Sequence, residues 1–190
     1  MSKIHWTLDP GHGELTEGKR SPLKDGRYIL EYQFNQEIVH RLSIMLSGEK
    51  ISHSITIPDP KGVGNDLEFR KGYVRAISDL FEDVVLVSIH GNAGPGIGFG
   101  DFTGIETFYN KLGIAHASIF QAEIVKATGL RSRGTKDGMK FHLLRNANVP
   151  AILTENGFYN GHDFDLMLTS DYRHSIAKAH FDAIMKIEAK

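Results

Sequence analysis

The sequence of 190 residues contains no cysteine. Disulfides, thiolate zinc sites and cysteine nucleophiles are therefore excluded, and a metal ion would have to be held by histidine, aspartate or glutamate. The chain also has no surplus of positive charge, because 22 basic side chains face 23 acidic ones. Since phosphate recognition depends on clustered lysine and arginine, this balance argues against binding to nucleic acid.

Long apolar runs are absent as well. No stretch of the sequence has the length needed to cross a bilayer, and residues 1–9 lack the apolar core of a signal peptide. We therefore expect no membrane insertion and no export by the ordinary signal route. The length is typical of one domain, so we expect a single domain over residues 1–190.

Three short apolar segments have the length and composition of strands, and each leads into a turn that carries a polar residue. They are residues 4–8 before His12, 84–89 before His90, and 150–154 before Glu155. Their hydrophobicity is unbroken rather than alternating, which is typical of strands covered on both faces. Residues 51–57 and 104–109 are weaker strand candidates.

Helical periodicity appears between these strands. Apolar residues recur at spacings of three and four over 34–46 and 112–122, a further helix is expected over 66–81, and the last one is expected to start after Ser170 as its cap. The alternation predicts an α/β fold with three layers, in which helices flank a mostly parallel twisted sheet. Residues 91–104 hold six glycines and are interpreted as a loop at the rim of a site.

A near-match to a phosphate-binding loop occurs at residues 13–20. Arg20 replaces the hydroxyl that would bind magnesium, and Pro22 stands where the following helix should already run. Nucleotide binding is therefore not expected. The sequence also lacks the G-x-S-x-G and H-E-x-x-H motifs of two common hydrolase classes.

His12, His90 and Glu155 each follow a predicted strand, so a parallel sheet would bring all three to one edge. Catalytic zinc needs three protein ligands and an open position for water, and these residue types suit it. Glu31 is a fourth candidate, although the N-terminus of the helix that follows it would also accommodate its charge. The residues alone leave open which glutamate binds the metal.

The other histidines are not assigned a role. His142 alternates with an apolar pair and is interpreted as the solvent-facing residue of a strand. The remaining ones occur in helical, edge or tail contexts and are treated as bystanders: His5, His40, His53, His116, His162, His174 and His180.

Four segments, taken in order, resemble the zinc-dependent N-acetylmuramoyl-L-alanine amidases of the Amidase_3 family. They are Leu8-Asp9-Pro10-Gly11-His12-Gly13, then Glu31, then Ser88-Ile89-His90-Gly91-Asn92-Ala93, and finally Glu155-Asn156-Gly157-Phe158. The resemblance covers nearly the whole chain. It implies one catalytic amidase domain that hydrolyses the amide between N-acetylmuramic acid and L-alanine in peptidoglycan.

The resemblance also implies the roles of the site residues. One Zn²⁺ per chain would be held by His12, Glu31 and His90, with Glu155 as the catalytic carboxylate. Asn92 is a candidate substrate-binding residue. The roles are chemically consistent, because zinc activates water and a nearby carboxylate can carry the proton.

Two departures from the family pattern concern the rim of the site. Glu14 stands where a second glycine is usual, and the insertion at 16–22 resembles phage-encoded members. Because the sequence shows no leader and no separate wall-binding repeat, we expect an endolysin that stays in the host cytoplasm until its release and then acts on the cell wall. The alternatives are a zinc hydrolase of another amide, such as a peptidase or deacetylase, and a non-catalytic wall-binding module. Nothing in the sequence predicts the oligomeric state.

Overall fold

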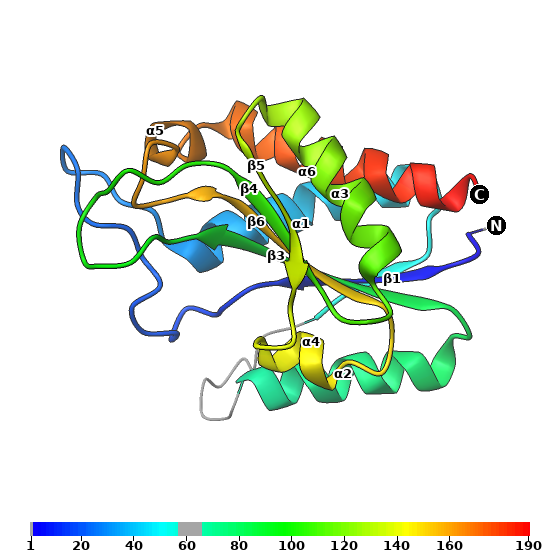
Figure 1. Ribbon diagram of the computed structural model, residues 1–190. Helices are drawn as coiled ribbons and strands as arrows, with labels where there is room; N and C mark the ends of the chain where they lie inside the picture. Colours follow the sequence, from blue (N-terminus) through cyan, green and yellow to red (C-terminus); the bar gives the residue numbers. More distant parts are fainter. Residues whose placement is uncertain (1, 57–65) are drawn as a thin grey trace.

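A six-stranded sheet forms the centre of the computed structural model, which describes residues 2–56 and 66–190 (Figure 1). Its strands lie in the order β2-β1-β3-β6-β4-β5, and all neighbours run parallel except β4 and β6. The mostly parallel α/β sheet predicted from the sequence is confirmed. The strands are β1 His5–Pro10, β2 His53–Ile55, β3 Val84–Asn92, β4 Ile105–Tyr109, β5 Ser132–Asp137 and β6 Ala151–Phe158.

Helices cover both faces of this sheet, as the three-layer prediction requires (Figure 1). One face carries α1 Glu31–Gly48, α3 Ile114–Thr128 and α6 Ser170–Glu188, and the other carries α2 Asp66–Leu80 and α4 His142–Asn146. A short helix, α5 Phe164–Met167, precedes α6. The cap of α6 is Thr169 rather than Ser170, because the Thr169 side chain accepts a hydrogen bond from the backbone of Tyr172.

The central strand β3 is buried on both faces of the sheet, which accounts for its unbroken run of apolar residues. Val85, Val87 and Ile89 belong to the large apolar cluster under α1, α3 and α6. Val84 and Leu86 belong to the second cluster under α2 and α4. Since successive side chains of a strand point to opposite faces, a strand buried on both sides needs apolar residues at every position.

The structure corrects several details of the sequence-based predictions. His142 is the first residue of α4, not a residue of a strand, because 142–146 form a helical turn under the sheet. His90 and Glu155 lie inside the carboxyl ends of β3 and β6 rather than after them. Strand β5 was not predicted, since its sequence SRGTKD has no apolar run and pairs only at the sheet edge. The candidate strand at 51–57 is reduced to His53–Ile55, and its residue 57 lies outside the described residues.

Within residues 2–56 and 66–190, none of the helices combines the length and apolarity needed to cross a membrane.

His180 is a completely buried histidine of α6. Its Nδ1 lies 2.8 Å from the carbonyl oxygen of Ile176, and its Nε2 lies 2.9 Å from the hydroxyl of Thr154. A carbonyl oxygen can only accept, so Nδ1 carries the proton and Nε2 accepts from Thr154. Burial lowers the pKa of His180 to about 4, which keeps the ring neutral at physiological pH.

This buried imidazole predicts a loss of stability in mild acid. The unfolded chain takes up a proton on this histidine near pH 6.5, whereas the folded protein does so only near pH 4, so the free energy of unfolding should fall as the pH drops through that window. The full difference is roughly 3 kcal/mol. Urea unfolding of the chelator-treated protein between pH 4.5 and pH 7 should show a shallower pH dependence for His180→Gln than for wild type. Equal slopes would contradict the assignment, and the exposed His174→Gln is the matched control.

Candidate metal centre

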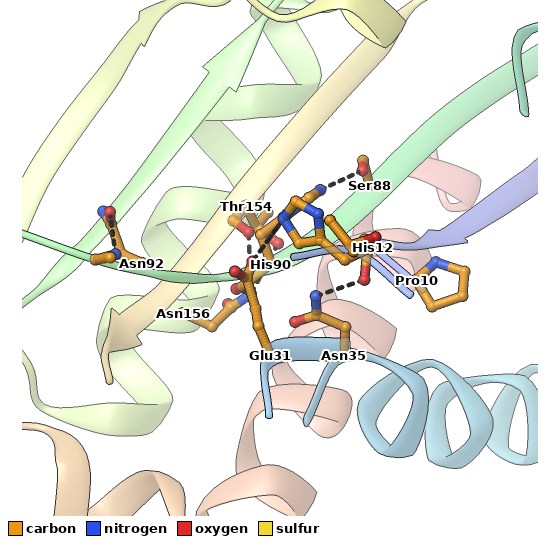
Figure 2. Close-up of polar contacts among 12 residues, drawn as sticks. Pro10, His12, Glu31, Asn35, Ser88, His90, Asn92, Thr154 and Asn156 are labelled. Carbon is orange, nitrogen blue, oxygen red and sulfur yellow. Dashed lines mark hydrogen bonds and ion pairs between the residues drawn. The ribbon is translucent and has the colours of Figure 1, made fainter. Parts of the chain in front are cut away.

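His12, Glu31 and His90 converge at the carboxyl edge of the sheet. His12 lies in the turn after β1, Glu31 is the first residue of α1, and His90 lies near the end of β3. One donor atom from each residue lies within 4.8 Å of the other two. Figure 2 shows the three side chains pointing toward one another from these three elements. The structure therefore brings together the three residues expected to bind a metal.

Glu31 lies between the two imidazoles. Its Oε1 lies 3.2 Å from Nε2 of His12 and 3.1 Å from Nδ1 of His90. The two rings meet edge to face, with 4.9 Å between their centroids. Burial alone would raise the pKa of Glu31, but hydrogen bonds with His12 and His90 outweigh it and lower the pKa to about 2. The carboxylate is therefore ionised and turned toward two nitrogen donors.

Ser88 assigns the tautomer of His90. The Ser88 hydroxyl donates to Oδ2 of Asp9 at 2.5 Å, so its oxygen is free to accept from Nε2 of His90 at 3.1 Å (Figure 2). With Nε2 bonded to Ser88, Nδ1 is the ring nitrogen that faces the Glu31 carboxylate. It donates a hydrogen bond to Glu31 when it is protonated, and it offers a lone pair to a cation when it is not. Imidazole nitrogen with carboxylate oxygen is a donor set that suits zinc.

Asp9 and Arg70 form a buried ion pair behind the centre. Asp9 also accepts from Thr56 at 2.5 Å, and Arg70 donates to Asp9 at 2.5 Å, to the carbonyl of Pro10 at 2.5 Å and to that of His12 at 2.7 Å. Burial would raise the pKa of Asp9, but Arg70 and the hydroxyl hydrogen bonds lower it. The charged pair thereby fixes the turn that presents His12, whose φ of +62° lies in the left-handed region.

Gly11 allows the close approach of His90 to this turn. A Cβ built at position 11 would lie 2.1 Å from the His90 ring, and Asn35 donates to the Gly11 carbonyl at 2.9 Å. Any side chain at this position would therefore displace the imidazole.

Glu155 lies beside His90, opposite it in the register of β3 and β6. Both residues line a cavity of about 930 Å³ together with His12 and Glu31. Burial raises the pKa of Glu155 to about 8; His90 opposes this rise, while Glu31 contributes to it. Its Oε2 is buried and has no hydrogen-bond partner among the described residues. A carboxyl group in this state can accept and release a proton near neutral pH.

Asn92 also lines this cavity, but the protein already engages its side chain. Its Nδ2 donates to Glu106 at 2.8 Å and its Oδ1 accepts from the backbone of Ala93 at 2.8 Å. Glu106 in turn pairs with Arg133 and Lys136. Substrate binding by Asn92 therefore stays a prediction.

The glycine-rich loop lies at the rim of the cavity, as expected. Its first residues, including Ala93, line the cavity, and its tip at Ile97 lines a second hollow of about 680 Å³. Tyr159 and Ala93 border both spaces. The insertion at 16–22 forms part of the opposite wall of the second hollow.

The model of the Amidase_3 family, described as N-acetylmuramoyl-L-alanine amidase, matches residues 7–186. The chain belongs to the Amidase_3 family. The match includes His12, Glu31, His90 and Glu155.

Curated relatives agree with this membership. The Amidase_3 chain is 31% identical over 183 residues to the N-acetylmuramoyl-L-alanine amidase CwlM of Bacillus licheniformis, covering 94% of this chain and 66% of that protein. It is 29% identical over 195 residues to the endolysin of Bacillus phage SPP1, covering 98% of this chain and 66% of that protein. The chain thus spans about two thirds of the length of these relatives.

Solved structures of the family share the fold over the whole chain. The amidase AmiC2 of Nostoc punctiforme has a TM-score of 0.83 at 25% identity, covering 100% of this chain and 99% of that one. An N-acetylmuramoyl-L-alanine amidase from Clostridium difficile 630 has a TM-score of 0.82 at 29% identity, and the match covers 98% of this chain and 97% of that one.

Several residues of this Amidase_3 site were missed by reasoning from the sequence. Asp9, Ser88 and Arg70 lie around the three converging residues. The first two stand within the family motifs but were given no role, and Arg70 was not named at all. Asp9 did offer a signal, because a carboxylate that ends an apolar strand is rarely buried without a partner. Arg70 offered none, since a single arginine in a helix is ordinarily exposed.

Proposed function

We propose that this chain is an N-acetylmuramoyl-L-alanine amidase that hydrolyses the amide between N-acetylmuramic acid and L-alanine in peptidoglycan. The observation that carries the proposal is the convergence of His12, Glu31 and His90 in the cavity that also holds Glu155. The family match and the names of the relatives support the choice of substrate. We further propose that residues 1–190 form a single catalytic domain.

We propose that His12, Glu31 and His90 hold one Zn²⁺. When bound, zinc acts as a Lewis acid toward water and the scissile carbonyl oxygen. The tautomer set by Ser88 leaves Nδ1 of His90 available as a ligand, and the buried Glu31 supplies the anionic donor. These residues fit the metal because each contributes a donor atom to the same small volume.

Glu155 is the proposed general base and acid. Glu155 lines a cavity large enough for substrate and water, and its buried Oε2 has no hydrogen-bond partner among the described residues. It would take a proton from the attacking water and return it to the leaving amine of L-alanine. Glu155 thus transfers one proton from the attacking water to the leaving amine, and its own protonation state is restored after each cycle.

Product analysis of purified sacculi tests the substrate. Amidase action should free L-alanine amino termini without creating reducing sugar ends, and chelation followed by zinc addition should abolish and restore it. Release of acetate would indicate a deacetylase, and cleavage within the stem peptide would indicate a peptidase. Binding to sacculi without any product would indicate a wall-binding module. Each of these three outcomes would overturn the proposal.

We propose a role in cell lysis, because one relative is named an endolysin. The protein would then act on the cell wall after release from the host cytoplasm. A fall in turbidity of permeabilised bacterial cells on addition of the purified protein tests this role, and unchanged turbidity together with active hydrolysis of sacculi would argue against it.

Gly11→Ala should weaken zinc binding without removing any ligand. The added methyl group would collide with the His90 ring, and displacing a ligand in this way should cost about 10-fold or more in affinity. Competition against a chromophoric chelator measures the change. Gly48→Ala is the matched control, because a Cβ there meets nothing within 4 Å. Equal zinc affinity of the two variants would contradict the prediction.

A further inference from the structure

Thr154 and Asn156 flank Glu155 in β6 but point to the opposite face of the sheet. Alternation along the strand places Glu155 toward the cavity and its two neighbours toward α6. Both neighbours are completely buried. They therefore occupy the back of the catalytic edge, where no substrate reaches them.

A directed chain of hydrogen bonds runs from α6 to the backbone of His90. Since His180 accepts from the Thr154 hydroxyl, the Thr154 oxygen is left to accept from Nδ2 of Asn156, at 3.0 Å. The same Nδ2 donates to the carbonyl oxygen of His90 at 3.0 Å. Figure 2 shows Thr154 and Asn156 grouped beside His90. Nδ2 also lies 3.2 Å from the carbonyl oxygen of Thr154, and Oδ1 of Asn156 has no hydrogen-bond partner among the described residues. The link from Thr154 to His90 therefore runs through the amide nitrogen of Asn156.

The chain reaches β3 at an irregular point of the sheet. The pairing of β3 with β6 shifts between His90 and Asn92, so that one residue of β3 lies opposite two residues of β6, Asn156 and Gly157. Gly157 has a φ of +91°, which favours glycine. A bulge of this kind re-aims side chains and interrupts ladder hydrogen bonds. The Asn156 side chain supplies a hydrogen bond to His90 where the regular ladder ends.

A second contact from α6 holds the other side of the bulge. The hydroxyl of Tyr172 donates to the carbonyl oxygen of Asn156 at 3.3 Å. Helix α6 thus contacts β6 on both sides of Glu155, through His180 at Thr154 and through Tyr172 at Asn156. His90 lies on β3 and Glu155 lies on β6. The hydrogen bonds of Thr154 and Asn156 connect these two strands and so help to set the position of His90 relative to Glu155.

We propose that Thr154 and Asn156 are positioning residues for the metal centre, which hold the His90 backbone so that its imidazole and the Glu155 carboxylate reach the same ion and water. This inference rests on the proposed zinc site. It assigns a function to buried side chains that do not touch substrate or metal. It also explains why a polar network lies in an otherwise apolar layer between β6 and α6.

Paired threonine variants test the proposal. Thr107 lies directly opposite Thr154 in β4, is equally buried, and donates to Gln121 of α3 rather than linking to His90. Thr154→Val and Thr107→Val should both lower the melting temperature of the chelated protein. Only Thr154→Val should lower Zn²⁺ affinity, by about 10-fold, and alter the visible spectrum of the Co²⁺-substituted protein. Thr154→Ser, which restores the hydroxyl, should recover both the affinity and the spectrum.

Asn156→Ala provides a second test that does not depend on Thr154. It removes the donor to the His90 carbonyl, and it should also lower Zn²⁺ affinity about 10-fold and change the Co²⁺ spectrum. The inference is overturned if wild type binds Zn²⁺ while Thr154→Val and Asn156→Ala match Thr107→Val in affinity and spectrum. Failure of wild type itself to bind Zn²⁺ would instead overturn the proposed metal site, and with it the inference.

Discussion

Glu155→Gln is expected to retain Zn²⁺ and to lose at least about 100-fold in kcat on peptidoglycan. The substitution keeps the size of the side chain but removes the carboxylate proposed to accept the proton of the attacking water. The metal should stay, because the three converging donors belong to His12, Glu31 and His90. Elemental analysis measures the bound Zn²⁺. The initial rate at which L-alanine amino termini are released measures kcat.

The exposed Glu17→Gln is the matched control, since it makes the same substitution away from the cavity lining. Its kcat should equal that of wild type. Turnover of Glu155→Gln within a few-fold of wild type would reassign the proton-transfer role, and loss of stoichiometric zinc from it would make Glu155 a ligand.

The strands that carry the site were predictable because burial on both faces leaves a simple sequence signal. In β3, each position from Val84 to Leu86 must be apolar, so an unbroken run identifies the strand and its end. Edge strand β5 has no such requirement, because its residues are exposed or only partly buried. Sequence pattern therefore reveals the centre of this sheet better than its margin.

The same apolar runs predicted the position of the candidate site. They did not predict the hydrogen bonds that hold His90 in place. His12 and His90 were found because each comes where an apolar strand ends, and parallel strands end at one edge. The bond from Ser88 to His90 and the bond from Asn156 to the His90 carbonyl depend on side-chain directions at a bulge. Neither hydrophobic periodicity nor residue spacing encodes such directions.

The remaining ambiguity, which glutamate binds the metal, is resolved by comparing single variants. His12→Ala, His90→Ala and Glu31→Gln should each weaken zinc binding by more than the roughly 10- to 100-fold that the loss of a supporting hydrogen bond costs, because a catalytic zinc has only three protein ligands. Glu155→Gln should bind zinc as wild type does. Stoichiometric zinc in any of the first three variants would contradict the assignment of that residue.

Thermal unfolding provides a readout of these variants that is independent of activity. Zinc binds the folded state selectively, so excess metal should raise the melting temperature of wild type and of Glu155→Gln. The variants of the three proposed ligands should show little or no rise. His174→Ala, which changes an exposed histidine of α6, should respond like wild type. Because Glu31 and Glu155 both line the cavity, a zinc-dependent rise that persists in Glu31→Gln and disappears in Glu155→Gln would exchange the roles of the two carboxylates.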